Sequence, residues 1–154
     1  MKKNIDILLR RYCDVAEMLS KMFDPYLEVI VHDLRKPEKS ILSIYNGHIT
    51  GRKVGDSTSD LGFKRAKGEA PDLMINYKNS SPQNKPLKSS SLTIRNDDGE
   101  VVGALSLNFD ISIFHSIKTI LDTFTKTQES DYIDEKELFK PHSIQAEIKQ
   151  VLDT

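Results

Sequence analysis

The sequence predicts an α+β fold in which a five-stranded antiparallel sheet carries short covering helices and is flanked by an amphipathic helix at each end. Apolar residues recur at helical spacing over residues 3–23 and again over 111–127. Between these helices lie runs rich in β-branched residues, separated by proline, glycine and polar turn residues. The clearest runs cover 89–95 and 100–110, and the Asn-Asp-Asp-Gly sequence between them is typical of a hairpin turn.

The first helix and a strand pair account for the amino-terminal part of the chain. Pro25 ends the helix, because proline disfavours helical geometry in the residue before it. Residues 27–33 and 40–46 predict two strands of a hairpin, interrupted by a Lys-Pro-Glu sequence. A glycine-punctuated stretch over 46–56 predicts a shaped loop, and residues 59–66 predict a short helix with a capping residue before it.

A shorter strand and a charged tail complete the pattern. Residues 74–77 predict a brief strand, and the polar, proline-containing segment 79–88 predicts a mobile loop before the long hairpin. The tail is compatible with a last short helix through Ile144, Ile148 and Leu152. This order of elements, with a helix before the strands and another after them, fits a PAS fold.

Length, charge and cysteine content exclude several classes of protein. A chain of 154 residues suits one domain, and its formal net charge of -1 provides no basic field to hold DNA or an anionic membrane. The single cysteine, Cys13, excludes an internal disulfide. No apolar run approaches the ~20 residues of a membrane span. We therefore expect a cytoplasmic protein.

Four stretches of the sequence carry a resemblance to a known family. They are Val-His-Asp-Leu at 31–34, the glycine-rich 43–55 with Asp-Leu at 60–61, then 87–95 and 103–110. The second contains Asn-Gly-His-Ile-x-Gly-Arg and the fourth ends in Leu-Asn-Phe-Asp, a specific combination. In this order they resemble the YheO-like PAS family, the sensory domains of a group of bacterial DNA-binding regulators. The resemblance implies a PAS-like sensory domain over residues 1–127 and a charged tail over 128–154, a possible linker to an absent helix-turn-helix.

The tail departs from what the resemblance implies. Members of the family typically carry a helix-turn-helix unit after the sensory domain, whereas residues 128–154 are charged and too short for that unit with its supporting helix. The chain is then either part of a longer regulator or a stand-alone sensor. In both cases we expect DNA contact only through a helix-turn-helix that is not present in this chain.

Small and polar residues share one face of the final hairpin. They are Val102, Ala104, Ser106, Asn108 and Asp110 on one strand, with Ser89, Ser91, Thr93 and Arg95 on its partner. One interpretation is the floor of a cavity, where Ser91, Ser106 and Asn108 hydrogen-bond a ligand. The alternative is an ordinary antiparallel pair that turns its polar side to solvent, and the sequence leaves both open.

A second group of candidate ligand contacts lies at the end of the first strand. His32 and Asp33 are adjacent there, so their side chains point to opposite faces of the sheet. We therefore expect one of the two to contact a ligand. The alternative is a strand-end pair that only hydrogen-bonds a nearby loop.

The glycine-rich loop supplies the last candidates, Asn46, His48 and Arg52. The guanidinium of Arg52 has a fork of donors that suits a carboxylate or phosphate on a small metabolite. An ion pair with Asp56 or Asp60 that merely stabilises the loop is an equally good explanation. The loop lacks the Gly-Lys-Ser/Thr ending of a phosphate-binding P-loop.

No pattern in the sequence indicates a metal, a cofactor or catalysis. The four histidines, at positions 32, 48, 115 and 142, are scattered without a second His or Cys at ligand spacing. Cys13 has no histidine beside it, and no Gly-x-Ser-x-Gly elbow is present. We therefore expect a protein that is not an enzyme.

The leading hypothesis is a sensor that binds a small polar metabolite, such as an amino acid or another carboxylate. A conformational change would then pass through its flanking helices, which we expect to pair in a homodimer. The alternative is a dimerisation and protein-interaction module that binds no small molecule. A structure without a cavity, together with a stable dimer, would favour the module.

Overall fold

The computed structural model describes residues 2–129, 131, 148, 151 and 152. Its elements are α1 (Lys2–Met22), β1 (Leu27–Asp33), the 3-10 turn η1 (Pro37–Lys39), β2 (Ile41–Tyr45), α2 (Asp60–Ala66), β3 (Leu73–Ser80), β4 (Pro86–Arg95), β5 (Val101–Asp110) and α3 (Ser112–Thr125). The sheet belongs to one compact unit that ends at Thr119. The short helix expected through Ile144 lies largely outside the described residues.

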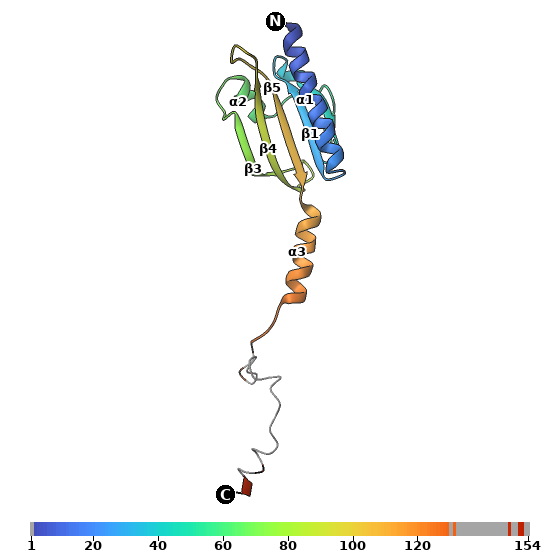
Figure 1. The fold of residues 1–154 in the computed structure, drawn as a ribbon, viewed down its shortest axis with the longest axis vertical. Coiled ribbons are helices and arrows are strands. Elements are labelled where there is room, and N and C mark those ends of the chain that lie inside the picture. Colours follow the sequence, from blue (N-terminus) through green and yellow to red (C-terminus); the bar gives the residue numbers. More distant parts are fainter. Residues whose placement is uncertain (1, 130, 132–147, 149–150, 153–154) are drawn as a thin grey trace. The chain divides into compact units, whose positions relative to one another are not determined.

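The five strands form one antiparallel sheet in the order β2-β1-β5-β4-β3 (Figure 1). The central pair, β1 and β5, runs in register from Leu27 opposite Phe109 to Asp33 opposite Gly103. On the other side of β5, Ser106 lies opposite Ser91 of β4. The predicted α+β, five-stranded antiparallel PAS fold is therefore confirmed, and the register determines which side chains share a face.

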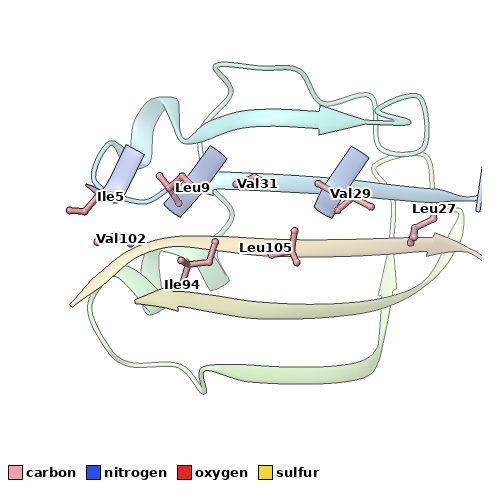
Figure 2. Close-up of a cluster of buried hydrophobic side chains, with 9 residues drawn as sticks. Ile5, Leu9, Leu27, Val29, Val31, Ile94, Val102 and Leu105 are labelled. Atoms are coloured by element: carbon pink, nitrogen blue, oxygen red, sulfur yellow. The ribbon is translucent and has the colours of Figure 1, made fainter. Parts of the chain in front are cut away.

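Helix α1 closes one face of the sheet with an apolar core (Figure 2). The core consists of Ile5, Leu9, Ala16, Leu27, Val29, Val31, Ile94, Val102 and Leu105. Close approach of α1 depends on Gly103, because a Cβ there would lie 2.7 Å from Leu9 Cδ2 and 2.5 Å from the His32 carbonyl oxygen. Apolar burial under α1 is thus the main source of stability on this face.

The opposite face of the sheet is covered by α2 and by the loop between β2 and α2. Glu28, Ile30 and His32 of β1 point to this side, since they alternate with the core residues of the same strand. Helix α2 begins at the predicted place, where the side chain of Ser59 accepts a hydrogen bond from the amide of Gly62. This face carries the polar residues of the final hairpin, most of them buried.

The expectation of a mobile loop over residues 79–88 is wrong. β3 continues to Ser80 and β4 begins at Pro86, so only residues 81–85 form the connection. The turn is closed by Ser81 N–H donating to the Lys85 carbonyl at 3.0 Å. Polar residues are compatible with strand structure here because β3 is the exposed edge strand, and proline is tolerated at the first position of a strand.

Candidate ligand-binding cavity

A cavity of about 160 Å³ lies between the polar face of the sheet and the segments that cover it. That volume accommodates roughly five water molecules or a small metabolite. Strands β1, β3, β4 and β5, helix α2 and the glycine-rich loop all contribute to its wall. Two larger hollows, of about 330 and 410 Å³, lie against α1 and are lined mostly by exposed or half-buried side chains. The buried polar groups therefore concentrate in the smaller cavity.

Four of the predicted contact residues line this cavity: His32, Arg52, Ser106 and Asn108. His32 is held by a 2.9 Å hydrogen bond between its Nδ1 and Ser40 Oγ. Burial lowers the pKa of His32 to about 4, with smaller contributions from the two nearby arginines. The imidazole is therefore neutral near pH 7, and it presents one donor and one acceptor.

The ion pair considered as an alternative for Arg52 does not form. Within the described part of the chain, neither Asp56 nor Asp60 pairs with its guanidinium. Arg52 Nη2 instead donates to the carbonyl of Ser57, and the carboxylate of Asp56 accepts from the amide of Lys53 at 2.9 Å. The charge of Arg52 therefore acts on the cavity that it lines and on the buried carboxylate of Glu28, where it opposes the rise in pKa that burial causes.

Asp33 lies on the α1 face, away from the cavity. Its Oδ2 accepts from Arg35 Nη2 at 2.7 Å, and the same guanidinium nitrogen also binds Asp6 of α1 at 2.8 Å. Burial opposes ionisation of Asp33, but the hydrogen bonds and charge of Arg35 outweigh it and lower the pKa. The structure therefore places Asp33 in a network that ties α1 to the end of β1.

The two remaining loop candidates also lie outside the cavity lining. Asn46 donates from Nδ2 to the carbonyl of Leu27 at 2.9 Å and adopts a left-handed φ of 55°. His48 is largely exposed, with Nε2 at 3.2 Å from the Pro25 carbonyl. Both side chains fasten the loop to the chain around β1.

Ser91 stands one layer behind the wall and holds a residue that the sequence analysis missed, Arg65 of α2. The Nη2 of Arg65 donates to Ser91 Oγ at 2.8 Å and to its carbonyl at 3.3 Å, while Nε has no partner. Only 2% of Arg65 is exposed. Burial lowers the pKa of Arg65, and Tyr77 and Asp72 offset part of that effect.

A helical signal for Arg65 was present in the sequence. Leu61 and Arg65 are four residues apart in the predicted short helix, so they share one side of it. Both line the cavity, together with Gly62. Because arginine side chains are mostly exposed to solvent, this spacing alone does not predict that Arg65 is buried.

Glu28 is the second residue that the sequence analysis missed. Its side chain is fully buried, with Oε1 accepting from Asn108 Nδ2 at 2.8 Å and Oε2 accepting from Thr50 Oγ1 at 2.6 Å. Asn108 Oδ1 in turn accepts from Ser89 Oγ at 2.7 Å. Burial raises the pKa of Glu28, and the hydrogen bonds from Thr50 and Asn108 oppose the rise. Glu28 thus fixes the orientation of two groups in the cavity wall.

The resulting cavity is electropositive and rich in hydrogen-bonding groups. Its lining contains the guanidinium groups of Arg52 and Arg65 and the neutral imidazole of His32, but no carboxylate. In the described residues, no group of three or more His, Cys, Asp or Glu side chains could hold a metal ion. The arrangement can bind a small polar molecule and favours one with a negative charge.

Comparison with known proteins identifies the family. The model of the YheO-like PAS domain matches residues 2–126. The transcriptional regulator DauR of Pseudomonas aeruginosa is 28% identical over 125 residues, covering 80% of this chain and 57% of the relative. The uncharacterised protein YheO of Escherichia coli is 27% identical over 127 residues, covering 80% and 52%.

A solved structure of an RNA-binding light-oxygen-voltage receptor aligns with a TM-score of 0.44 and 14% identity, over 70% of this chain and 36% of that one. The chain spans just over half the length of the curated relatives it matches. Among the helices of the described residues, none combines the length and the apolar character of a membrane span. Since the family model covers most of the sequence, the chain belongs to the family of YheO-like PAS domains.

Proposed function

We propose that this chain is the ligand-sensing domain of a bacterial transcription regulator and binds a small polar metabolite in the cavity under α2. The observation that carries the proposal is a hollow of about 160 Å³ lined by His32, Arg52, Arg65 and Asn108. A domain selected only for packing would fill this space with apolar side chains. The relative named as a transcriptional regulator supports the regulatory role.

Ligand contacts on β5 have a short covalent route to α3. Asn108 lies two residues before the end of β5, and only Ile111 separates that strand from α3. A ligand that biases β5 would therefore act directly on the start of the exit helix. DNA contacts of the regulator would lie in the portion of the relatives' length that this chain does not span.

We also propose that the domain forms a homodimer through its flanking helices. Large apolar side chains remain exposed on the outer side of α1, at Ile7, Val15, Met18 and Met22. A stripe of this kind on an otherwise solvated helix is typical of an interaction surface. Size-exclusion chromatography with light scattering tests this: wild type should elute as a dimer, and Met18→Glu should shift it toward monomer. A monomeric wild type would reject the dimer.

A dimerisation module without a ligand is the second candidate. The size of the cavity favours it, because about 160 Å³ lies below the ~300 Å³ of typical drug-sized sites. In that case, the polar wall would enclose only water.

Native mass spectrometry of gently purified protein distinguishes the two. We expect a discrete small-molecule adduct on the wild type, or a metabolite that raises its melting temperature in a thermal-shift screen. Ser106→Leu should abolish either signal because the new side chain occupies the cavity. Ser116→Leu, an identical change at an exposed position of α3, should retain it. A wild type that binds no metabolite in either experiment would leave only the dimerisation module.

A further inference from the structure

We propose that Arg65 is the anchor of the ligand and that it binds a carboxylate group. This inference rests on the proposed sensory function and deepens it by naming the ligand's chemical class. It also moves the anionic contact from Arg52, the arginine that the sequence favours, to a residue on α2. Four features of the structure support it.

The first feature is the burial of Arg65 without a counter-ion. Its side chain lies against the cavity with 2% of the residue exposed, and no carboxylate pairs with it in the described part of the chain. A charged group removed from water is costly unless an opposite charge compensates it. The nearby carboxylate of Asp72 is already engaged by both Nε and Nη2 of Arg95, at 2.8 Å each. An anion in the cavity would supply the missing charge.

The second feature is the unused hydrogen-bonding capacity of Arg65. Ser91 occupies Nη2 through its Oγ and its carbonyl, and this orients the guanidinium plane. Nε is buried and has no partner. Buried polar groups without partners are rare, and each calls for an explanation such as an absent ligand. A carboxylate accepts from two guanidinium nitrogens through two oxygens and also brings the negative charge that a water molecule lacks.

The third feature is the charge of the remaining wall. Arg52 adds a second positive charge and His32 is neutral, while no Asp or Glu lines the cavity. Glu28 stands behind the wall, where it accepts from Thr50 and Asn108 and offsets part of the charge of Arg52. A cation in this cavity would face repulsion from two guanidinium groups, whereas an anion would be attracted by both.

The fourth feature is size. A volume of about 160 Å³ admits a short-chain carboxylate, and the Ser106 hydroxyl is available to a further polar atom of the ligand. The Tyr77 hydroxyl already donates to Ser91 Oγ, and the amide of Asn108 is engaged by Glu28 and Ser89. The apolar part of the wall, which includes Ile30, Leu61 and Leu87, suits a few methylene groups of a ligand. The structure therefore favours a small monocarboxylate or dicarboxylate.

A purely structural role for Arg65 makes different predictions. In that case, its bonds to Ser91 would serve only to fasten α2 to β4. Arg65→Gln would then lower the melting temperature of the ligand-free protein, and added anions would have no effect. If Arg65 is an anchor, its buried charge is only partly offset by Asp72 in the ligand-free protein, so Arg65→Gln should leave that protein equally stable or more stable.

The experiment is a thermal-shift and calorimetric titration of the full chain with matched probes. Acetate, propionate and succinate are compared with acetamide, propionamide and succinamide at constant ionic strength, and inorganic phosphate is a separate arm. The variants are Arg65→Gln, Arg65→Lys and, as a control for charge on the same helix, the exposed Lys64→Gln. Far-UV circular dichroism checks that each variant is folded.

We expect at least one carboxylate to stabilise wild type and Lys64→Gln, with no response to its amide. Arg65→Gln should bind it at least about tenfold more weakly, and Arg65→Lys should be intermediate because lysine is a point charge without the fork. The inference is overturned if no carboxylate stabilises the wild type, if Arg65→Gln binds as well as wild type, or if phosphate alone binds.

Failure of this inference is distinguishable from failure of the proposed function. A neutral metabolite that binds the wild type and Arg65→Gln equally would leave the sensor intact and reject the carboxylate anchor. Absence of binding by any compound, charged or neutral, would reject both. Partial retention of carboxylate binding in Arg65→Lys supports the anchor even if Arg65→Gln does not fold.

Discussion

The two faces of the sheet are built on different principles. Under α1, Leu9, Val31 and Leu105 belong to one buried apolar cluster (Figure 2). Under α2, His32 and Arg65 border a hollow of about 160 Å³. Because side chains of a strand alternate between faces, β1 serves both, with valines on one side and hydrogen-bonding groups on the other. Truncation of an apolar side chain under α1 should therefore act on stability alone, whereas changes under α2 act on recognition or on the pH dependence of stability.

The largest expected effect on stability comes from the α1 face. Leu9 is 1% exposed and packs over Gly103. Leu9→Ala should lower the free energy of unfolding by about 3 to 4 kcal/mol, through lost apolar burial and the remaining cavity. Urea denaturation measures this, with Arg10→Ala, at an exposed position of the same helix outside the apolar stripe, as the control. A loss below about 1 kcal/mol for Leu9→Ala would show that the α1 face is not the main source of stability.

The next effect belongs to the cavity face and depends on pH. The pKa of His32 is about 4 in the folded protein against an ordinary 6.5, so the unfolded chain binds more protons between these values. Stability should therefore fall as pH decreases from about 6.5 to 4, by up to about 3 kcal/mol. His32→Asn keeps a polar partner for Ser40 but cannot titrate, so it should lack this slope. Urea denaturation from pH 4 to 7 measures this dependence. If the stability of wild type and that of His32→Asn change equally with pH, His32 is not the buried titrating group.

The sequence predicted the α1 face and most of the fold because their patterns are local and periodic. The helical spacing of apolar residues predicted α1 and α3. The alternation over 89–95 and 100–110 predicted the final hairpin of β4 and β5. Segment 79–88 was misassigned because a polar edge strand and a polar loop have similar composition. Because β3 is an exposed edge strand, it needs no apolar residues at alternate positions, and this alternation is the pattern that predicts a strand.

The cavity face was predicted only in part, because its chemistry comes from pairs distant in sequence. His32, Ser106 and Asn108 lie on strands whose alternation indicates a common face, and they line the same cavity. Arg65 and Ser91 are 26 residues apart, and Glu28 and Asn108 are 80 apart. No local pattern shows that a buried charge will find its partner across the sheet, so both charges were missed.

A smaller effect, of opposite sign to that of His32, should come from Glu28. Burial raises the pKa of Glu28 above 4.5, so the folded protein binds the extra proton and loses stability as pH rises above that value. The hydrogen bonds from Thr50 and Asn108 limit the loss. The stability of wild type relative to Glu28→Gln should therefore decrease from pH 4 to pH 7. Glu69→Gln, at an exposed position, is the control. If the difference in stability between wild type and Glu28→Gln does not change with pH, the raised pKa of the buried carboxyl is contradicted.

The smallest expected effect on stability is that of Ser106→Ala. Ser106 borders the cavity, and its hydroxyl forms no hydrogen bond within the described residues. Because no buried partner is lost, the free energy of unfolding should change by no more than about 0.5 kcal/mol. Ligand affinity should nonetheless change wherever the hydroxyl contacts the ligand. A stability loss above about 1.5 kcal/mol would mean that the polar face is held together by its hydroxyls, and the separation between a stabilising face and a recognition face would fail at the centre of the sheet.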